Sequence, residues 1–367
     1  MQAPNTPTGI LAARLGAQLL AGTSARDPAA VAGRLLAVQA QDLQGARLAI
    51  RARTSRLTSA RIDSAFTTER SIVITWLNRG TLHLVRGDDY AWLHALTAPG
   101  VVSSNARRLR QEGVSPKDAE KGVAMVKRSL AEDGPLTRQQ IGERVRAARV
   151  PVAGQALVHL LLLASLHGLI VRGPIVGGEH AFVLTRDWLG EAKKTFERER
   201  ALAELARRYL AGHGPATDRD LAYWSGLALR DARAGLKAIG SEVVERGGLV
   251  SLKSMKPTSV LPPPRLLGSF DPVLLGWTSR EPVLGANAPA VVTGGLFRPF
   301  ALVRGRAVAT WTIRSGEVQL KPFRPLSQRD SADLNADAQD VVRFLKIRQI
   351  TKRVLWPPQS AAATRTA

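Results

Sequence analysis

GPLTRQQI, residues 134–141, recurs in outline as GPATDRDL, residues 214–221, and this repeat indicates how the chain is organised. In each copy a threonine, Thr137 or Thr217, stands where its side chain can cap the N-terminus of a short amphipathic helix. A helix start that occurs twice in the same setting indicates that one structural unit is repeated along the chain.

Further helices surround each copy of the repeat. A longer helical stretch precedes each short helix, and another helix follows it. The preceding stretches are residues 117–131 and 191–211, and the following ones are residues 152–167 and 228–239. Each following helix stops at a glycine suited to a left-handed C-cap, Gly168 or Gly240. Each unit is therefore expected to contain three helices.

A β-hairpin is expected after each set of three helices. β-prone residues flank a glycine pair in both units. The first hairpin joins residues 169–172 to 181–184 through Gly177-Gly178, and the second joins residues 243–244 to 249–252 through Gly247-Gly248. Three helices followed by a hairpin are the order of elements in a winged helix.

A third and more diverged copy of this unit fits the N-terminus. Its helices are expected at residues 10–21, 27–36 and 59–66, with Pro28 at the first position of the second helix. Its hairpin would join residues 72–77 to 81–85 around Asn78-Arg79-Gly80. The sequence thus predicts three tandem winged helices.

The composition and the hydrophobic pattern of the sequence change after about Lys256. Pro262-Pro263-Pro264 breaks any helix, and short alternating segments follow. Residues 301–303 and 307–313, joined by Arg304-Gly305-Arg306, predict a hairpin in a small β-rich module. A final helix, about residues 331–345, is expected to pack back on the fold, and the tail after Trp356 is expected to be frayed.

Composition narrows the class of protein. Against 30 Asp and Glu there are 52 Lys and Arg, a net charge of +22, which favours a polyanionic partner and nucleic acid first. The absence of cysteine excludes disulfide scaffolds, thiolate metal sites and cysteine nucleophiles. Residues 1–9 lack a signal-peptide pattern, and the longest apolar run, residues 156–166, is short for a membrane span. We expect a cytoplasmic, nucleoid-associated protein.

Common catalytic motifs are missing from the chain. It has no phosphate-binding Gly-x-x-x-x-Gly-Lys loop, no dinucleotide Gly-x-Gly-x-x-Gly after a strand, no His-Glu-x-x-His and no Gly-x-Ser-x-Gly. The six histidines are scattered without the spacing of metal ligands. Nucleotide hydrolysis, dinucleotide redox chemistry and zinc proteolysis lose support, and we expect no metal and no cofactor.

The segment Val38-Gln39-Ala40-Gln41-Asp42 stands out at the end of the second predicted helix. Its two amides, Gln39 and Gln41, share a side only if the backbone there is extended. Composition alone favours a plain interpretation, in which both are solvated or capping side chains.

Several segments together resemble the bacterial winged-helix DNA glycosylases of the AlkZ family, which are associated with self-resistance to azinomycin-type DNA cross-linkers. They occur in order between about residues 10 and 325. They are Gln39-Ala40-Gln41, RGTLHLV (79–85), DLAYWSG (220–226), SFDP (269–272) and the strand from Gly305 to Trp311.

The resemblance implies an α+β fold in which three tandem winged helices form a C and precede a β-barrel-like module. The expected divisions are residues 1–110, 111–190 and 191–256 for the winged helices, 257–328 for the module with its DNA-facing hairpin, and 329–367 for the C-terminal helix and tail. The family's glutamine–hydrophobic–glutamine motif maps onto Gln39, Ala40 and Gln41 and faces the DNA channel. A sister branch has aspartate in place of the second glutamine, so the chain resembles the AlkZ branch.

Two amides are a weak catalytic pair, and this points to a labile substrate. A glutamine cannot act as a general base, but its carbonyl accepts from water and its NH₂ donates. Glycosidic cleavage passes through an oxocarbenium-like transition state and is easiest when the leaving base is already cationic. With the resemblance, this predicts a monomeric, monofunctional glycosylase in which Gln39 and Gln41 hold the water that releases N7-alkylguanines, cross-linked ones included, from double-stranded DNA.

Arginines at predicted turns are the candidates for DNA contact. Arg79 lies in the first hairpin turn, and Arg304 and Arg306 lie in the turn of the β-rich module, where such proteins meet phosphates or a groove. Solvated turn charge is an equal alternative for each. Trp76, Trp224 and Trp311 are expected in the core rather than as base-stacking platforms.

Two other functions stay open at this level. A non-catalytic tandem winged-helix regulator or architectural protein explains the charge and the repeats equally well, but gives no reason for the glutamine pair. A drug-sequestering resistance protein needs an apolar pocket and no DNA, and the charge of +22 counts against it.

Overall fold

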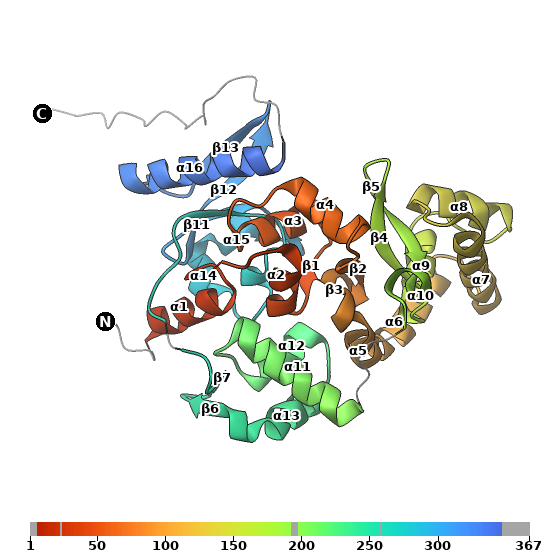
Figure 1. Cartoon of the computed structure of the whole chain (residues 1–367), viewed down its shortest axis with the longest axis horizontal. Helices are drawn as coiled ribbons and strands as arrows, with labels where there is room; N and C mark the ends of the chain where they lie inside the picture. Colours follow the sequence, from red (N-terminus) through yellow and green to blue (C-terminus); the bar gives the residue numbers. More distant parts are fainter. Residues whose placement is uncertain (1–5, 23, 192–196, 257, 347–367) are drawn as a thin grey trace, which may run out of the picture.

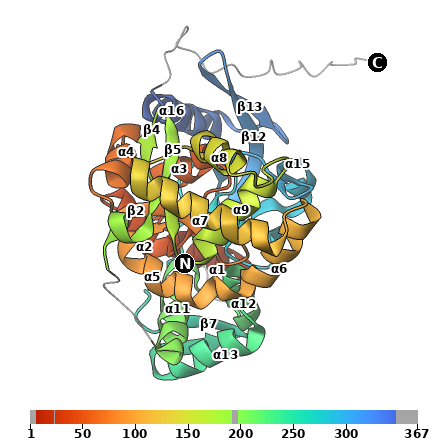
Figure 2. The same cartoon turned by 90° about the vertical axis from the view of Figure 1, so that its right-hand side faces the viewer.

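The computed structural model describes residues 6–22, 24–191, 197–256 and 258–346. It is a mixed α/β structure in which a C-terminal sheet and the last helix lie at one end and the helices of residues 198–238 lie at the opposite end (Figures 1 and 2). No helix within those ranges is long and apolar enough to cross a membrane.

The N-terminal part contains the predicted helices and hairpin. The structure places α1 at Pro7–Ala17, α2 at Pro28–Leu35, α4 at Ser59–Thr67, β2 at Ile72–Leu77 and β3 at Thr81–Arg86. Pro28 opens α2 as predicted, and Asp27 caps it by accepting from Ala30 N at 2.7 Å. Four elements were not predicted: β1 (Val38–Gln39), α3 (Leu43–Arg51), α5 (Gly87–Thr97) and α6 (Pro99–Gln111).

The two later units also follow the predicted order of elements. The first has α7 (Pro116–Asp133), α8 (Arg138–Ala147), α9 (Ala156–Leu166), β4 (Ile170–Val176), β5 (Glu179–Leu184) and α10 (Thr185–Leu189). The second has α11 (Arg198–His213), α12 (Asp218–Ser225), α13 (Leu229–Ala238), β6 (Val243–Arg246) and β7 (Leu249–Leu252).

The predicted caps of these units are right in three of four positions. Thr137 and Thr217 each form a capping box with the third residue of the helix that follows. Gly168 adopts the left-handed conformation after α9, with φ of +73°. The prediction for Gly240 is wrong, because the chain continues there into a 3₁₀ turn, Gly240–Glu242, without a positive φ.

The first two predicted hairpins are joined in one sheet. They form one five-stranded antiparallel sheet in the order β1-β3-β2-β4-β5, in which Ile74 of β2 pairs with Arg172 of β4. Every residue of β2 is buried. Because successive side chains of a strand point to opposite faces, Ile74 and Trp76 enter one apolar core while Val73 and Leu77 enter another. The hairpin β6–β7 forms a sheet of its own.

The C-terminal β-rich module contains an open sheet. Its four strands lie in the order β13-β12-β11-β8, and in the described part of the chain they do not close into a barrel. They are β8 (Arg265–Leu267), β11 (Phe300–Val303), β12 (Arg306–Arg314) and β13 (Glu317–Pro322); α14 (Glu281–Leu284), α15 (Ala288–Val291) and the pair β9 (Val292–Thr293) and β10 (Leu296–Phe297) lie between β8 and β11.

The last helix, α16 (Gln328–Phe344), packs back on this sheet as predicted. Buried Asp337 of α16 accepts from Leu266 N at 2.7 Å and pairs with Arg51 of α3. Trp76, Trp224 and Trp311 are buried, with at most 5% of each exposed, which confirms their assignment to the core. The predicted fraying of the tail concerns residues outside those the structure describes.

Candidate active site

Gln39 lies in a strand rather than at a helix end. Leu36, with φ of +65°, ends α2, and the chain then runs antiparallel to β3. Gln39 lies opposite His83, and Ala40 N donates to Leu82 O at 2.7 Å. The backbone is therefore extended at the point where the Gln39–Gln41 hypothesis required it.

Gln39, Arg79 and His83 meet at one small cavity. Its open space is about 10 Å³, close to what one water molecule needs and far too small for a purine. The remaining walls are Ala37, Trp224, Pro272 and Leu275. Four segments that stand far apart in the sequence thus converge on a space the size of one water.

A buried ion pair fixes the Pro272 wall. Asp271 and Arg53 are both fully buried, and two hydrogen bonds of 2.8 and 2.9 Å join them. Asp271 also accepts from Val273 N at 3.0 Å. Because an uncompensated buried charge is costly, this pair holds the SFDP segment, and with it Pro272, against the turn that follows α3.

Asp220 fixes the wall that α12 contributes. Its carboxylate accepts from Thr217 N and from both N and Oγ1 of Thr278, at 2.8–3.0 Å. Burial raises the pKa of Asp220, but these hydrogen bonds outweigh burial and hold the pKa below its usual value. The DLAYWSG segment is thereby tied to the chain that follows Leu275, and Trp224 is placed at the cavity.

A cationic rim borders the cavity. Exposed Arg79 stacks over the ring of Tyr223, with its guanidinium carbon 4.4 Å from the ring centroid. The Tyr223 hydroxyl accepts from Arg280 at 2.9 Å. Burial raises the pKa of Tyr223, but the charges of Arg280 and Arg79 lower it by more than burial raises it. The pKa is therefore below its ordinary value. Arg79 therefore brings an exposed positive charge to the cavity, and Arg280 holds the tyrosine on which it stacks.

The cavity holds no ready proton donor. Burial lowers the pKa of His83 to about 4; the Thr81 carbonyl opposes this shift and Arg79 adds to it. His83 is neutral at physiological pH, and no carboxylic acid is among the described residues that line the cavity. The site is suited to holding a water and unsuited to protonating a leaving group.

Gln41, Arg304 and Arg306 do not line this cavity. Gln41 is exposed, and its Oε1 accepts from Leu82 N at 3.2 Å, which is the capping contact that composition alone favours. Arg304 is 71% exposed and pairs with Asp330 at 3.2 Å, and Arg306 is exposed. The turn between them packs on α1, where a Cβ on Gly305 would lie 2.9 Å from Leu11.

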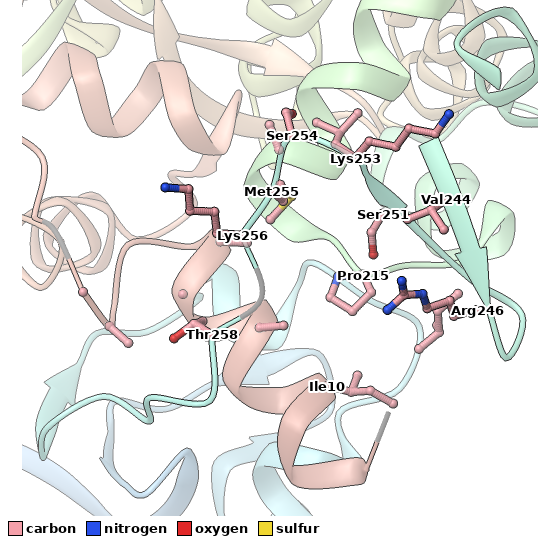
Figure 3. A pocket seen from close by; sticks show the side chains of 18 of the residues that line it. Ile10, Pro215, Val244, Arg246, Ser251, Lys253, Ser254, Met255, Lys256 and Thr258 are labelled. Carbon is pink, nitrogen blue, oxygen red and sulfur yellow. The ribbon is translucent and has the colours of Figure 1, made fainter. Parts of the chain in front are cut away.

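A wider cleft of about 700 Å³ lies between α1 and the hairpin β6–β7 (Figure 3). Arg246 reaches from the hairpin toward Pro215 in the loop before α12. The cleft is lined by four cations and, among described residues, by no carboxylate; the cations are Arg34, Arg246, Lys253 and Lys256. None of the predicted catalytic side chains faces it. The same described ranges contain no group of three or more His, Asp or Glu placed to hold a metal.

His83 is the polar cavity residue that was not predicted as part of the site. It stands in the RGTLHLV hairpin, whose strands were predicted, but β1 was not recognised as a strand beside them. Extending the antiparallel register of β2–β3 by one more strand would have placed His83 next to Gln39.

The chain is similar to known proteins over most of its length. A family model described as "DNA glycosylase AlkZ-like" matches residues 32–344. A Streptomyces sahachiroi protein named "Interstrand DNA cross-link repair glycosylase" is 26% identical over 369 residues, which cover 94% of this chain and 98% of that one. The solved structure of the "Streptomyces sahachiroi DNA glycosylase AlkZ" matches with a TM-score of 0.76 and 25% identity, over 97% of this chain and 100% of that one.

Proposed function

Since the chain belongs to the AlkZ-like family of DNA glycosylases, we propose that it hydrolyses the N-glycosidic bond of N7-alkylguanines in double-stranded DNA. The proposal includes bulky adducts and the guanines of interstrand cross-links, and a role in self-resistance to a genotoxic natural product. The name of the relative, a cross-link repair glycosylase, supports the choice of lesion.

The observation that carries this proposal is the composition of the Gln39 cavity. It has room for about one water, and it contains an amide and a neutral imidazole but no acid. Without an acid, the departing base must leave without being protonated. Alkylation at N7 makes guanine cationic before it leaves, so positioning a water and stabilising the sugar cation suffice.

Gln39 and Gln41 are assigned to the water as a pair. Gln39 reaches it from inside the cavity. Gln41 is held just beyond β1, where its Oε1 accepts from Leu82 N, and it supports the water through this strand rather than from the cavity wall. This anchored amide also fixes the end of the strand that carries Gln39, so the two side chains act as one unit.

Tolerance of bulky lesions follows from the size of the site. A glycosylase that reads a flipped base needs a pocket that encloses it. The cavity at Gln39 is water-sized, so selection by fit of the base is weak there and selection by ease of departure is strong. A guanine that is still linked to the opposite strand then meets no size limit.

The proposed binding to DNA is supported by the net charge and by the three helix-and-hairpin units. The net charge of +22 and the cationic rim at Arg79 favour phosphate contacts. We include in the proposal that the three helix-and-hairpin units are winged helices with the boundaries predicted from the sequence, and that Arg304 and Arg306 contact the backbone.

The test is single-turnover excision on matched duplexes that carry N7-methylguanine, an N7-linked interstrand cross-link or uracil, with abasic sites read as strand breaks after alkali. We expect release of both alkylated guanines and almost none of uracil, whose departure needs the protonation that this cavity lacks. Efficient uracil release without action on either alkylated substrate would overturn the proposed chemistry.

A non-catalytic DNA-binding regulator predicts binding to all three duplexes and strand breaks in none. Membership of a glycosylase family already disfavours this alternative. Equal affinity without any base release would revive it.

A further inference from the structure

His83 and Gln39 form a directly opposed pair across β1 and β3. The hydrogen bond from Ala40 N to Leu82 O makes the neighbouring position a hydrogen-bonded pair. In an antiparallel ladder the next pair is then non-hydrogen-bonded, and its side chains stand closest, with Cβ atoms about 4.5–5.5 Å apart. Both side chains line the water-sized cavity.

The ring of His83 is held in one tautomer. Its Nδ1 lies 2.9 Å from the carbonyl oxygen of Thr81 on the same strand. Because a carbonyl oxygen only accepts, Nδ1 carries the proton, and in the neutral ring Nε2 presents a lone pair. Only 5% of the residue is exposed and it lines the cavity, so the ring is largely shielded from bulk solvent.

A water that attacks a sugar cation needs two acceptors for its hydrogens and a lone pair turned to the carbon. Gln39 lines the cavity, and its amide oxygen can serve as one acceptor. The Oε1 of Gln41 already accepts from Leu82 N and lies outside the cavity lining. We propose that Nε2 of His83 is the second acceptor of the catalytic water, so that Gln39 and His83 together aim it at the sugar; this inference rests on the proposed function.

The step balances without any further reagent. The bond from C1′ to N9 breaks, and its electron pair neutralises the cationic N7-alkylguanine as it leaves. A lone pair of the water forms the new C1′–O bond. The resulting oxonium is a far stronger acid than an imidazolium, so its proton passes to Nε2 of His83 and from there to solvent.

The charged and titratable groups around His83 come from four segments. Arg79 follows β2, Tyr223 of α12 stacks with Arg79, and Arg280 binds the Tyr223 hydroxyl. Asp271, beside the Pro272 wall, is bound to Arg53. Burial first, and the charge of Arg79 after it, lower the pKa of His83 and keep its acceptor available.

Two isosteric variants separate this role from a structural one. Asparagine places an N–H near the position of Nδ1, so His83→Asn keeps the contact to Thr81 and removes the acceptor. Glutamine places an amide near the position of Nε2, so His83→Gln keeps an acceptor and loses the contact to Thr81. We expect single-turnover release of N7-methylguanine to fall about 10–100-fold in His83→Asn and to stay within about threefold of wild type in His83→Gln.

A structural role for His83 predicts the reverse order, and either that order or a wild-type rate in His83→Asn would overturn the inference. A double variant with Gln39→Ala should lose less than the product of the two single losses, because both residues hold one water. A full product would count against a shared water. Affinity for the duplex, measured alongside, should stay within about twofold in every variant.

The pH profile of the wild-type chain covers the case in which a variant fails to fold. The rate, corrected for spontaneous depurination, should be level down to about pH 5 and fall toward about pH 4 as the acceptor is protonated. A rate that stays level through pH 4 would contradict the inference. Failure of the wild-type chain to release N7-methylguanine at any pH would instead overturn the proposed function itself.

Discussion

The hairpins β2–β3 and β6–β7 come from the same sequence pattern, two β-prone segments around a turn with glycine, but they differ in burial and in strand pairing. β2 is buried along its whole length between two apolar cores and is hydrogen-bonded on both sides. β6–β7 pairs with no third strand within the described residues, and none of the residues of β6 is buried.

The difference lies in side chains rather than in the turn. β2 reads IVITWL, a continuous apolar run of the kind that suits a strand covered on both faces, whereas β6 reads VVER. The turn signal predicts a hairpin in both places, but hydrophobicity decides whether other strands join it. In this chain the buried hairpin positions the cavity, and the exposed one borders the cationic cleft.

Removing apolar contacts should therefore destabilise the two hairpins very unequally. We expect Ile74→Ala in β2 to lower the free energy of unfolding by about 2–5 kcal/mol, since Ile74 is 1% exposed and a cavity remains. Leu249→Ala in half-buried β7 should cost about 1 kcal/mol or less. Urea unfolding followed by circular dichroism measures both, and equal losses would show that the comparison is wrong.

Base release should depend on Gln39 and Gln41 at the edge of the sheet and not on an exposed glutamine nearby. Gln39→Ala should lower the single-turnover rate about 10–100-fold with little change in duplex affinity. Gln41→Ala should lower it in the same direction, and the double variant should lose less than the product of the single effects. Gln44→Ala, an exposed glutamine at the start of α3, is the matched control and should retain the wild-type rate.

If Gln39→Ala and Gln41→Ala both release N7-methylguanine at the wild-type rate, the two amides are capping residues only. The contact from Leu82 N to Gln41 would then be their whole role.

The cleft beside β6–β7 should contribute to affinity rather than to chemistry. Neutralising Arg246, Lys253 and Lys256 together should weaken duplex binding several-fold and flatten its salt dependence by about 0.9 per lost phosphate contact on log–log axes. A control variant with Lys117, Lys121 and Lys127 of α7 replaced by alanine removes the same charge from exposed positions elsewhere.

Fluorescence anisotropy over a salt titration distinguishes the two variants. Equal losses would mean that net charge alone drives binding and that the cleft has no special part in it.

Local signals predicted much of the fold, because caps and turns are decided by neighbouring residues. Thr137 and Thr217 cap their helices, and Asn78-Arg79-Gly80 turns the first hairpin as its sequence indicates. The joining of β2 to β4 was not predictable in the same way, because it depends on contacts between segments about 100 residues apart, and neither strand carries a signal for its partner.

The candidate site was predicted in part for the same reason. The motif at Gln39 was visible because two amides near a helix end are unusual, and Arg79 because turns expose charge. His83 was hidden, since a histidine in an apolar strand most often packs in the core. Asp271 and Asp220 stood out within distinctive segments, yet their carboxylates hold the walls of the cavity and do not face it.

The smallest expected effect is that of pH between about 8 and 6. It concerns the five-stranded sheet, which contains His83 and His180, and not the hairpin β6–β7, which contains no histidine. Burial lowers the pKa of His83 and of His180, both in the five-stranded sheet, to about 4, and no histidine occurs in residues 214–367. Both rings stay neutral in the folded chain over this interval, so the rate of N7-methylguanine release should change less than about twofold. Below about pH 6.5 the histidines of the unfolded chain bind protons, whereas His83 and His180 in the folded sheet stay neutral. The stability of the folded chain should therefore decline as the pH falls further toward 4. Parallel rate and unfolding measurements check both parts, and a rate that rises steeply between pH 8 and 6 would reveal a proton donor that the cavity at Gln39 does not contain.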